Sequence, residues 1–210
     1  MKTFLKLKHW QLFGILMFIP MIYPFVIMGS VITSSNLTNI SSSNLIDITN
    51  SYLTRIFATS PVIMVLFTGL LLCWFYSMGT NLHKKLPQTV KMNLTQFKLF
   101  LFFPAICKVI TSIFLPDLFS EIMSGGQLNS TLLAFAIPLY LFSTFCIFYC
   151  FYFIAKALKS VERQEPVTFD DFSEEFVLIW LFPIGVWLIQ PKMNKLFGYS
   201  LDIKSNPAYN

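Results

Sequence analysis

Long uncharged apolar runs dominate the pattern of hydrophobic and polar positions along this chain. Four of them are long enough to cross a bilayer, which takes about 20 residues because each helical residue rises about 1.5 Å through roughly 30 Å of hydrocarbon. They cover approximately residues 10–33, 61–80, 97–118 and 131–155. A soluble helix would keep a broad polar stripe toward water. The pattern therefore predicts an all-α membrane protein with a bundle of four transmembrane helices.

A fifth apolar run, residues 176–189, has 14 residues and is interrupted by Pro183 and Gly185. As a helix it would be about 21 Å long, which is too short to cross a bilayer comfortably. We expect it to be re-entrant or to lie along the inner surface, with Pro191 as its end. A short or tilted fifth crossing is the remaining alternative.

An amphipathic segment precedes this run. Aromatic side chains recur at helical spacing, at Phe169, Phe172 and Phe176. Four carboxylates are expected elsewhere on the same helix, at Asp170, Asp171, Glu174 and Glu175. Thr168 is the expected N-cap, since the helix dipole favours negative charge in the first turns. Residues 161–210 are thus predicted to form an amphipathic or re-entrant segment and a tail at the cytoplasmic face, following a transmembrane domain of residues 1–160.

Two weaker patterns concern the arrangement of the spans. Residues 75–83 align with residues 151–159 at an offset of 76, which suggests two helical hairpins of the same orientation. A short helix is expected before the second span, from an apolar stripe at Leu45, Ile48, Tyr52 and Ile56.

Basic residues flank the apolar runs unevenly. With four crossings, every lysine and arginine except Arg55 and the intramembrane Lys108 lies on one side: Lys2, Lys6, Lys8, Lys84, Lys85, Lys91, Lys98, Lys156, Lys159, Arg163, Lys192, Lys195 and Lys204. A fifth crossing would move the last three of these to the other side. Because lysine and arginine are retained in the cytoplasm, the pattern predicts four crossings with both termini cytoplasmic.

Composition agrees with a lipid environment. Hydrophobic residues make up 55% of the chain and charged residues 12%, whereas about a quarter of a soluble domain is charged. The net charge of +5 comes from short scattered clusters, which does not favour nucleic acid as a partner. All four cysteines lie in apolar runs and are expected to pack as small hydrophobic residues.

Lys108 lies near the middle of the third run. A lysine at the centre of a membrane helix costs about 2.5–3.5 kcal/mol on insertion scales. A functional lysine there would bind an anionic group or relay a proton, with its pKa lowered by desolvation. Alternatively, it snorkels to the membrane surface or bonds to hydroxyls inside the bundle, at Tyr140, Ser143 or Thr144.

No catalytic, cofactor or metal motif is found: H-E-x-x-H, G-x-S-x-G and P-loop patterns do not occur. A divalent cation at the acidic helix is disfavoured because no glycine-containing ligand loop accompanies it. We predict an interaction surface there instead, made by Phe169, Asp170, Asp171, Phe172, Glu174 and Glu175.

The C-terminal part carries IWLFPIGVWLIQPKMNKLF at residues 179–197 and YFIAKALK at residues 152–159. These segments resemble the C-terminal part of small, uncharacterised multi-span bacterial integral membrane proteins, which carry a Trp-Phe-Pro-Ile-Gly-type segment followed by Gln-Pro and a basic residue. The resemblance is confined to the C-terminal quarter. It implies a bacterial inner membrane and brings no activity with it.

Three functions are compatible with these patterns. The favoured one is a non-catalytic membrane subunit that contacts another membrane protein or a further copy of itself. The first alternative is a small carrier or channel with Lys108 in the path and a first helix bent at Pro20 and Pro24. The second is a membrane-embedded enzyme that modifies lipid, using the acidic cluster together with Lys84 or Lys85.

Overall fold

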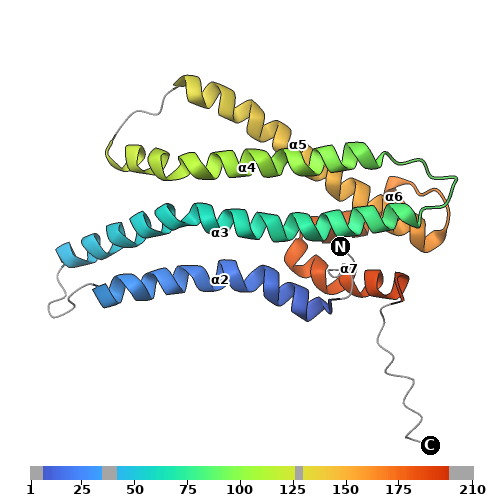
Figure 1. Cartoon of the computed structure of the whole chain (residues 1–210), viewed down its shortest axis with the longest axis horizontal. Helices are drawn as coiled ribbons and strands as arrows, with labels where there is room; N and C mark the ends of the chain where they lie inside the picture. The colour runs from blue at the N-terminus through green and yellow to red at the C-terminus, as the bar shows by residue number, and fades with distance from the viewer. Residues whose placement is uncertain (1–6, 35–41, 126–129, 199–210) are drawn as a thin grey trace, which may run out of the picture. The chain divides into compact units, whose positions relative to one another are not determined.

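Helices make up nearly all of the described chain, which comprises residues 7–34, 42–125 and 130–198 of a computed structural model (Figure 1). They are α2 (His9–Ser34), α3 (Ser42–Lys84), α4 (Leu94–Met123), α5 (Ser130–Arg163), α6 (Phe169–Trp180) and α7 (Phe182–Leu196). No strand occurs in these three stretches. The predicted all-α class is confirmed.

Four helices are long and apolar enough to cross a membrane, over His9–Ser34, Leu45–Lys84, Leu94–Phe114 and Ala134–Arg163. Helices α2 to α5 contain the four predicted runs, so the prediction of a four-span membrane protein is confirmed. The helix expected before the second span is present and is continuous with that span. Its apolar stripe belongs to α3, which continues through Pro61 without a break because a proline removes only one hydrogen bond of a long helix.

The described chain divides into two compact units, and each long helix contributes to both. Unit 2 comprises Leu16–Leu72 and Phe102–Cys146. Its large apolar side chains are mostly exposed, as lipid-facing side chains would be; Phe25 and Phe135 are 76% and 77% exposed. Inside it, the hydroxyl of Tyr23 donates to the carbonyl of Ile56 at 2.8 Å, which joins α2 to α3.

Unit 1 comprises residues 1–15, 73–101 and 147–210 and contains most of the buried side chains of the described chain. Its centre is a stack of aromatic rings, with the centroids of Phe97 and Phe153 4.4 Å apart. Gly79 lies against the ring of Phe97, since a Cβ added there would be 2.4 Å from its Cε1 and Cζ atoms. The absence of a side chain at Gly79 therefore sets how closely α3 and α4 approach.

The two segments of the weak repeat meet inside unit 1. Phe75 and Phe151 occupy equivalent positions at the offset of 76, and their ring centroids are 5.6 Å apart. Both segments are the C-terminal ends of long helices, α3 and α5. The repeat itself stays a prediction, and the contact shows that its two copies are neighbours.

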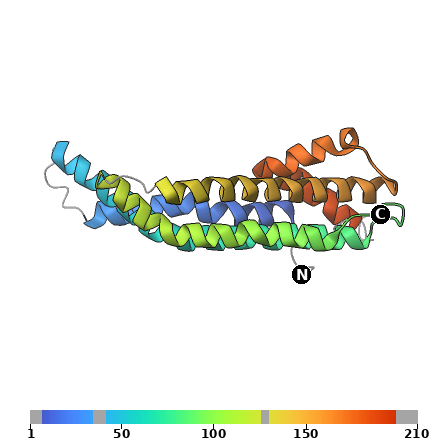
Figure 2. The same ribbon diagram turned by 90° about the horizontal axis from the view of Figure 1, so that it is seen from above.

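The fifth apolar run folds as a helical hairpin instead of one helix. It breaks at Leu181, whose φ of −81° and ψ of 52° are not helical. Helix α6 runs antiparallel to the end of α5, because Tyr152 contacts Phe172 while Phe148 contacts Trp180 (Figure 2). Helix α7 then returns beside α6. With 12 and 15 residues, neither helix is long enough to span a bilayer.

The residues at the turn explain the break. Pro183 lies in the first turn of α7, where a missing backbone N–H costs nothing. The prediction that Pro191 ends the segment is wrong, because α7 continues through Pro191 to Leu196. Gly185 faces the backbone of α6, and a Cβ added there would be 1.8 Å from the carbonyl oxygen of Leu178. Only glycine permits this approach of the two helices.

We expect Gly185→Ala to destabilise the hairpin by about 1–3 kcal/mol, since the added methyl group must push two backbones apart. The unfolding midpoint during titration of the detergent-solubilised protein with SDS measures this. Gly14→Ala is the matched control, because a Cβ at Gly14 meets no atom within 4 Å and alanine favours a helix. Equal midpoints for the two variants would contradict the close approach.

Candidate functional site

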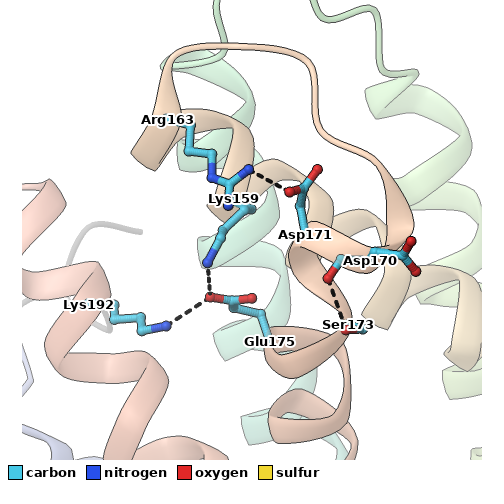
Figure 3. A network of polar contacts seen from close by, with 7 residues as sticks. All are labelled: Lys159, Arg163, Asp170, Asp171, Ser173, Glu175 and Lys192. Atoms are coloured by element: carbon cyan, nitrogen blue, oxygen red, sulfur yellow. Dashed lines mark hydrogen bonds and ion pairs between the residues drawn. The ribbon is translucent and has the colours of Figure 1, made fainter.

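The connection from α5 to α6 is fixed by a cap at the start of α6. Thr168 is the N-cap, as predicted. The carboxylate of Asp171 accepts hydrogen bonds from the backbone N–H of Thr168 at 2.9 Å and from its hydroxyl at 2.8 Å. Its other oxygen accepts from the guanidinium of Arg163 at the end of α5 (Figure 3). The first turn of α6 is therefore tied to the last turn of α5.

A buried carboxylate joins three helices one turn further along α6. The side chain of Glu175 is 0% exposed, and its Oε1 accepts from Lys159 Nζ of α5 at 3.0 Å and from Lys192 Nζ of α7 at 2.8 Å. Figure 3 shows the two lysines approaching this oxygen from different helices. We call Glu175, Lys159 and Lys192 the carboxylate clamp. Breaking such a pair leaves a charge with no compensation, which costs several kcal/mol.

The charges of both carboxylates are favoured by their surroundings. Hydrogen bonds from the backbone and hydroxyl of Thr168, and then from Arg163, lower the pKa of Asp171 to about 2. Burial alone would raise the pKa of Glu175, but the hydrogen bonds from Lys192 and Lys159 outweigh it and the pKa is lowered. Burial likewise opposes the charge of Lys192, yet the bond to Glu175 raises its pKa. Both pKa shifts favour the charged forms of Glu175 and Lys192.

A second polar contact holds α7 from the other side. The side chain of Gln190 is buried; its Oε1 accepts from the indole N–H of Trp74 at 3.2 Å and its Nε2 donates to the carbonyl of Leu7 at 3.0 Å. Asn194 donates to the same carbonyl at 3.3 Å. Near the end of α7, Lys85 Nζ donates to the carbonyl of Leu196 at 2.6 Å. Helix α7 is therefore anchored to α3 and to the start of α2.

Only some residues of the predicted interaction surface are exposed. Phe172 and Glu175 are buried against α5 and cannot contact a partner, so these two assignments are wrong. They are three positions apart, which places both on one face of the helix. Asp171 is half-buried and paired with Arg163. The residues that do face outward are Phe169, Asp170 and Glu174.

Lys108 is exposed on α4, within unit 2. No described residue accepts a hydrogen bond from its ammonium group, and the hydroxyl of Thr144 donates to the carbonyl of Tyr140. The alternative in which Lys108 bonds to hydroxyls inside the bundle is therefore wrong for the described chain. A role in anion binding or proton transfer stays a prediction.

Metal chemistry finds no support among the described residues, where no three His, Cys, Asp or Glu side chains lie close enough to hold an ion. Two carboxylates of the acidic helix turn toward cationic side chains instead of toward one another. The four cysteines are free. These ion pairs hold α6 against its neighbouring helices.

Sequence reasoning missed the partners in this site. In the sequence, Lys159 and Lys192 indicate only the orientation of the chain in the membrane. No local pattern indicates the hydrogen bond between Trp74 and Gln190. The one available signal is Gln190 itself, an uncharged polar residue at the end of an apolar run. A buried amide needs hydrogen-bond partners, which points to a contact with another segment.

Glu175→Gln should loosen α6, because it keeps the shape of the side chain and leaves the two lysines of the clamp without a counter-charge. The expected cost is about 2–3 kcal/mol, below the value for a fully buried pair because Lys192 reaches solvent. Faster amide hydrogen exchange across α6 measures it. The neighbouring exposed Glu174→Gln is the control, and equal exchange in the two variants would show that the clamp does not hold α6.

Comparison with known proteins adds no family to this description: no family model, curated protein or solved structure matches the chain.

Proposed function

We propose that this chain is a multi-pass protein of a bacterial inner membrane, with both termini cytoplasmic, that acts as a non-catalytic membrane subunit by contact with another protein. The observation that carries the proposal is the division of charge on α6. Asp171 and Glu175 form ion pairs that hold the helix in place. Asp170 and Glu174 are exposed, as is the ring of Phe169.

The orientation is supported by where the basic residues lie. Among the described residues, unit 2 contains only Arg55 and Lys108. The others belong to unit 1: Lys8, Lys84, Lys85, Lys91, Lys98, Lys156, Lys159, Arg163, Lys192 and Lys195. Lys2, Lys6 and Lys204 lie outside the described residues. Because lysine and arginine are retained in the cytoplasm, this distribution favours a cytoplasmic location for the basic residues of unit 1. The resemblance of the C-terminal segment favours a bacterial source.

A docking role follows from the rigidity of α6. A helix held at Asp171 and Glu175 loses little conformational entropy when a partner binds it. Exposed aromatic rings provide much of the energy of protein interfaces, and charged neighbours provide selectivity. Phe169 with Asp170 and Glu174 offers both within the first two turns of α6. The partner that this surface fits has an apolar pocket next to lysine or arginine.

The alternatives receive less support. Lys108 is exposed within one chain, so a transport path along it would require further subunits. A lipid-modifying enzyme would need a free acid and base, yet Asp171 and Glu175 are paired with cations and Lys85 donates to a backbone carbonyl.

The orientation predicts cytoplasmic signals from reporters fused after Lys159 and after Asn210. Paired reporters that are active only in the cytoplasm or only outside it check this in cells. Since the hairpin of α6 and α7 enters and leaves on one side, the two fusions should agree. Opposite signals would overturn both the orientation and the number of crossings.

If Phe169, Asp170 and Glu174 form a docking surface, changing the ring and the two charges should abolish binding of the partner. The triple variant Phe169→Ala, Asp170→Lys, Glu174→Lys should lose a stoichiometric partner during purification in mild detergent. Glu162→Lys with Glu165→Lys is the matched control, because these exposed acidic residues belong to unit 1 but lie outside α6. Equal recovery by both variants, or recovery of the wild-type chain alone, would refute the contact function.

A further inference from the structure

The turn between α6 and α7 presents an apolar surface that the rest of unit 1 leaves open. Its exposed side chains are Val177, Trp180, Leu181, Ile184, Trp187 and Leu188, which we call the hairpin tip. The opposite face of the same two helices is buried through Ile179, Val186 and Ile189. The hairpin thus has an apolar inner face, as any packed helix does, and a second apolar surface confined to its turn.

The hairpin tip lies beside the points at which two membrane-spanning helices begin to expose apolar side chains. Trp180 contacts Phe148, which is the last exposed large apolar side chain along α5. Trp187 contacts His9 and Phe13 at the start of α2, with ring centroids 4.8 and 5.4 Å apart. Within unit 1, the tip therefore lies beside the ends of α2 and α5, whose apolar side chains Trp10, Ile15, Ile147 and Phe148 are exposed.

Charge marks the other end of the hairpin. From Glu175 of the clamp to Leu181 is about 9 Å along the helix, at about 1.5 Å per residue. Beyond the clamp lie Arg163 and the exposed Asp170, which require water. The hairpin changes from charged to apolar over a distance that matches the roughly 5–10 Å by which interfacial helices enter the headgroup and acyl boundary.

We propose that the hairpin tip inserts into the cytoplasmic leaflet, where lipid acyl chains cover Trp180, Leu181, Ile184 and Leu188. Two tryptophans at the edge of the surface fit this location, since indole rings concentrate at membrane interfaces. The chain returns on the side from which it entered, so the hairpin is an anchor and not a crossing. It holds unit 1 against the membrane at a point separate from the four spans.

Lipid is the occupant that this surface fits, because its exposed side chains are apolar, two of them are tryptophans, and it adjoins the ends of two helices that are apolar enough to cross a membrane. The inference relies on the proposed orientation only to name the leaflet, and it does not involve the docking surface at Phe169. Its failure and that of the proposed function are thus separable.

Tryptophan quenching in proteoliposomes tests the inference. One variant carries Trp10→Phe and Trp187→Phe and keeps Trp180 with the fully buried Trp74. A second variant also carries Trp180→Phe, so that its fluorescence comes from Trp74 alone. Neither variant changes Trp74 or its hydrogen-bond partner Gln190. Lipids brominated on the acyl chains should quench the first variant several-fold more than the second, while aqueous acrylamide should distinguish them little.

Two results would overturn the inference. Quenching of Trp180 by acrylamide without quenching by brominated lipid would place the tip in water. Resistance to both quenchers would mean that protein covers the tip, either a second copy or a different partner. Since both leaflets contain brominated lipid, an inverted orientation would not change the readout.

Discussion

An ionised carboxylate removed from water must be compensated by cations, and the arrangement of the C-terminal helices depends on that constraint at Glu175. Its loss of hydration costs several kcal/mol, which only close and well-directed donors offset. Lys159 and Lys192 provide them from α5 and α7. Because the carboxylate belongs to α6, one side chain fixes this helix against two others. Aromatic contacts between Phe148 and Phe176 and between Tyr152 and Phe172 then fix the position of α6 along the axis of α5.

The turn of the hairpin is governed by backbone hydrogen bonds and backbone space. In a medium with little water, every N–H and C=O needs a partner within the protein. The carbonyl of Leu181 accepts from the N–H groups of Ile184 and Gly185, both at 2.9 Å, so the chain reverses with these groups satisfied. Gly185 then lets α7 pass the carbonyl of Leu178. An apolar run of this length thus yields two short helices with satisfied backbones instead of one incomplete span.

The four spans and the cap at Thr168 could be predicted because each depends on a local pattern. Long apolar runs define the spans, and one hydroxyl before an acidic turn defines the cap. The assignment of Glu175 to an exposed surface is wrong because it treats all four carboxylates of the helix alike, whatever face they lie on. At 100° per residue, Glu175 lies only about 60° from Phe172 on the helical wheel. Its partners are 16 and 17 residues away in the chain, so no local pattern could pair them.

The clamp also explains why α6 can meet two different environments. If all four carboxylates of α6 were unpaired, each would need water, including Glu175, which lies only six residues before Leu181. Here Asp171 and Glu175 are neutralised by neighbours, so Asp170 and Glu174 alone keep one end of α6 in water. The helix can therefore expose charge at its start and Trp180 at its end. Inward pairing of two carboxylates is what separates a polar surface from an apolar one along only 12 residues.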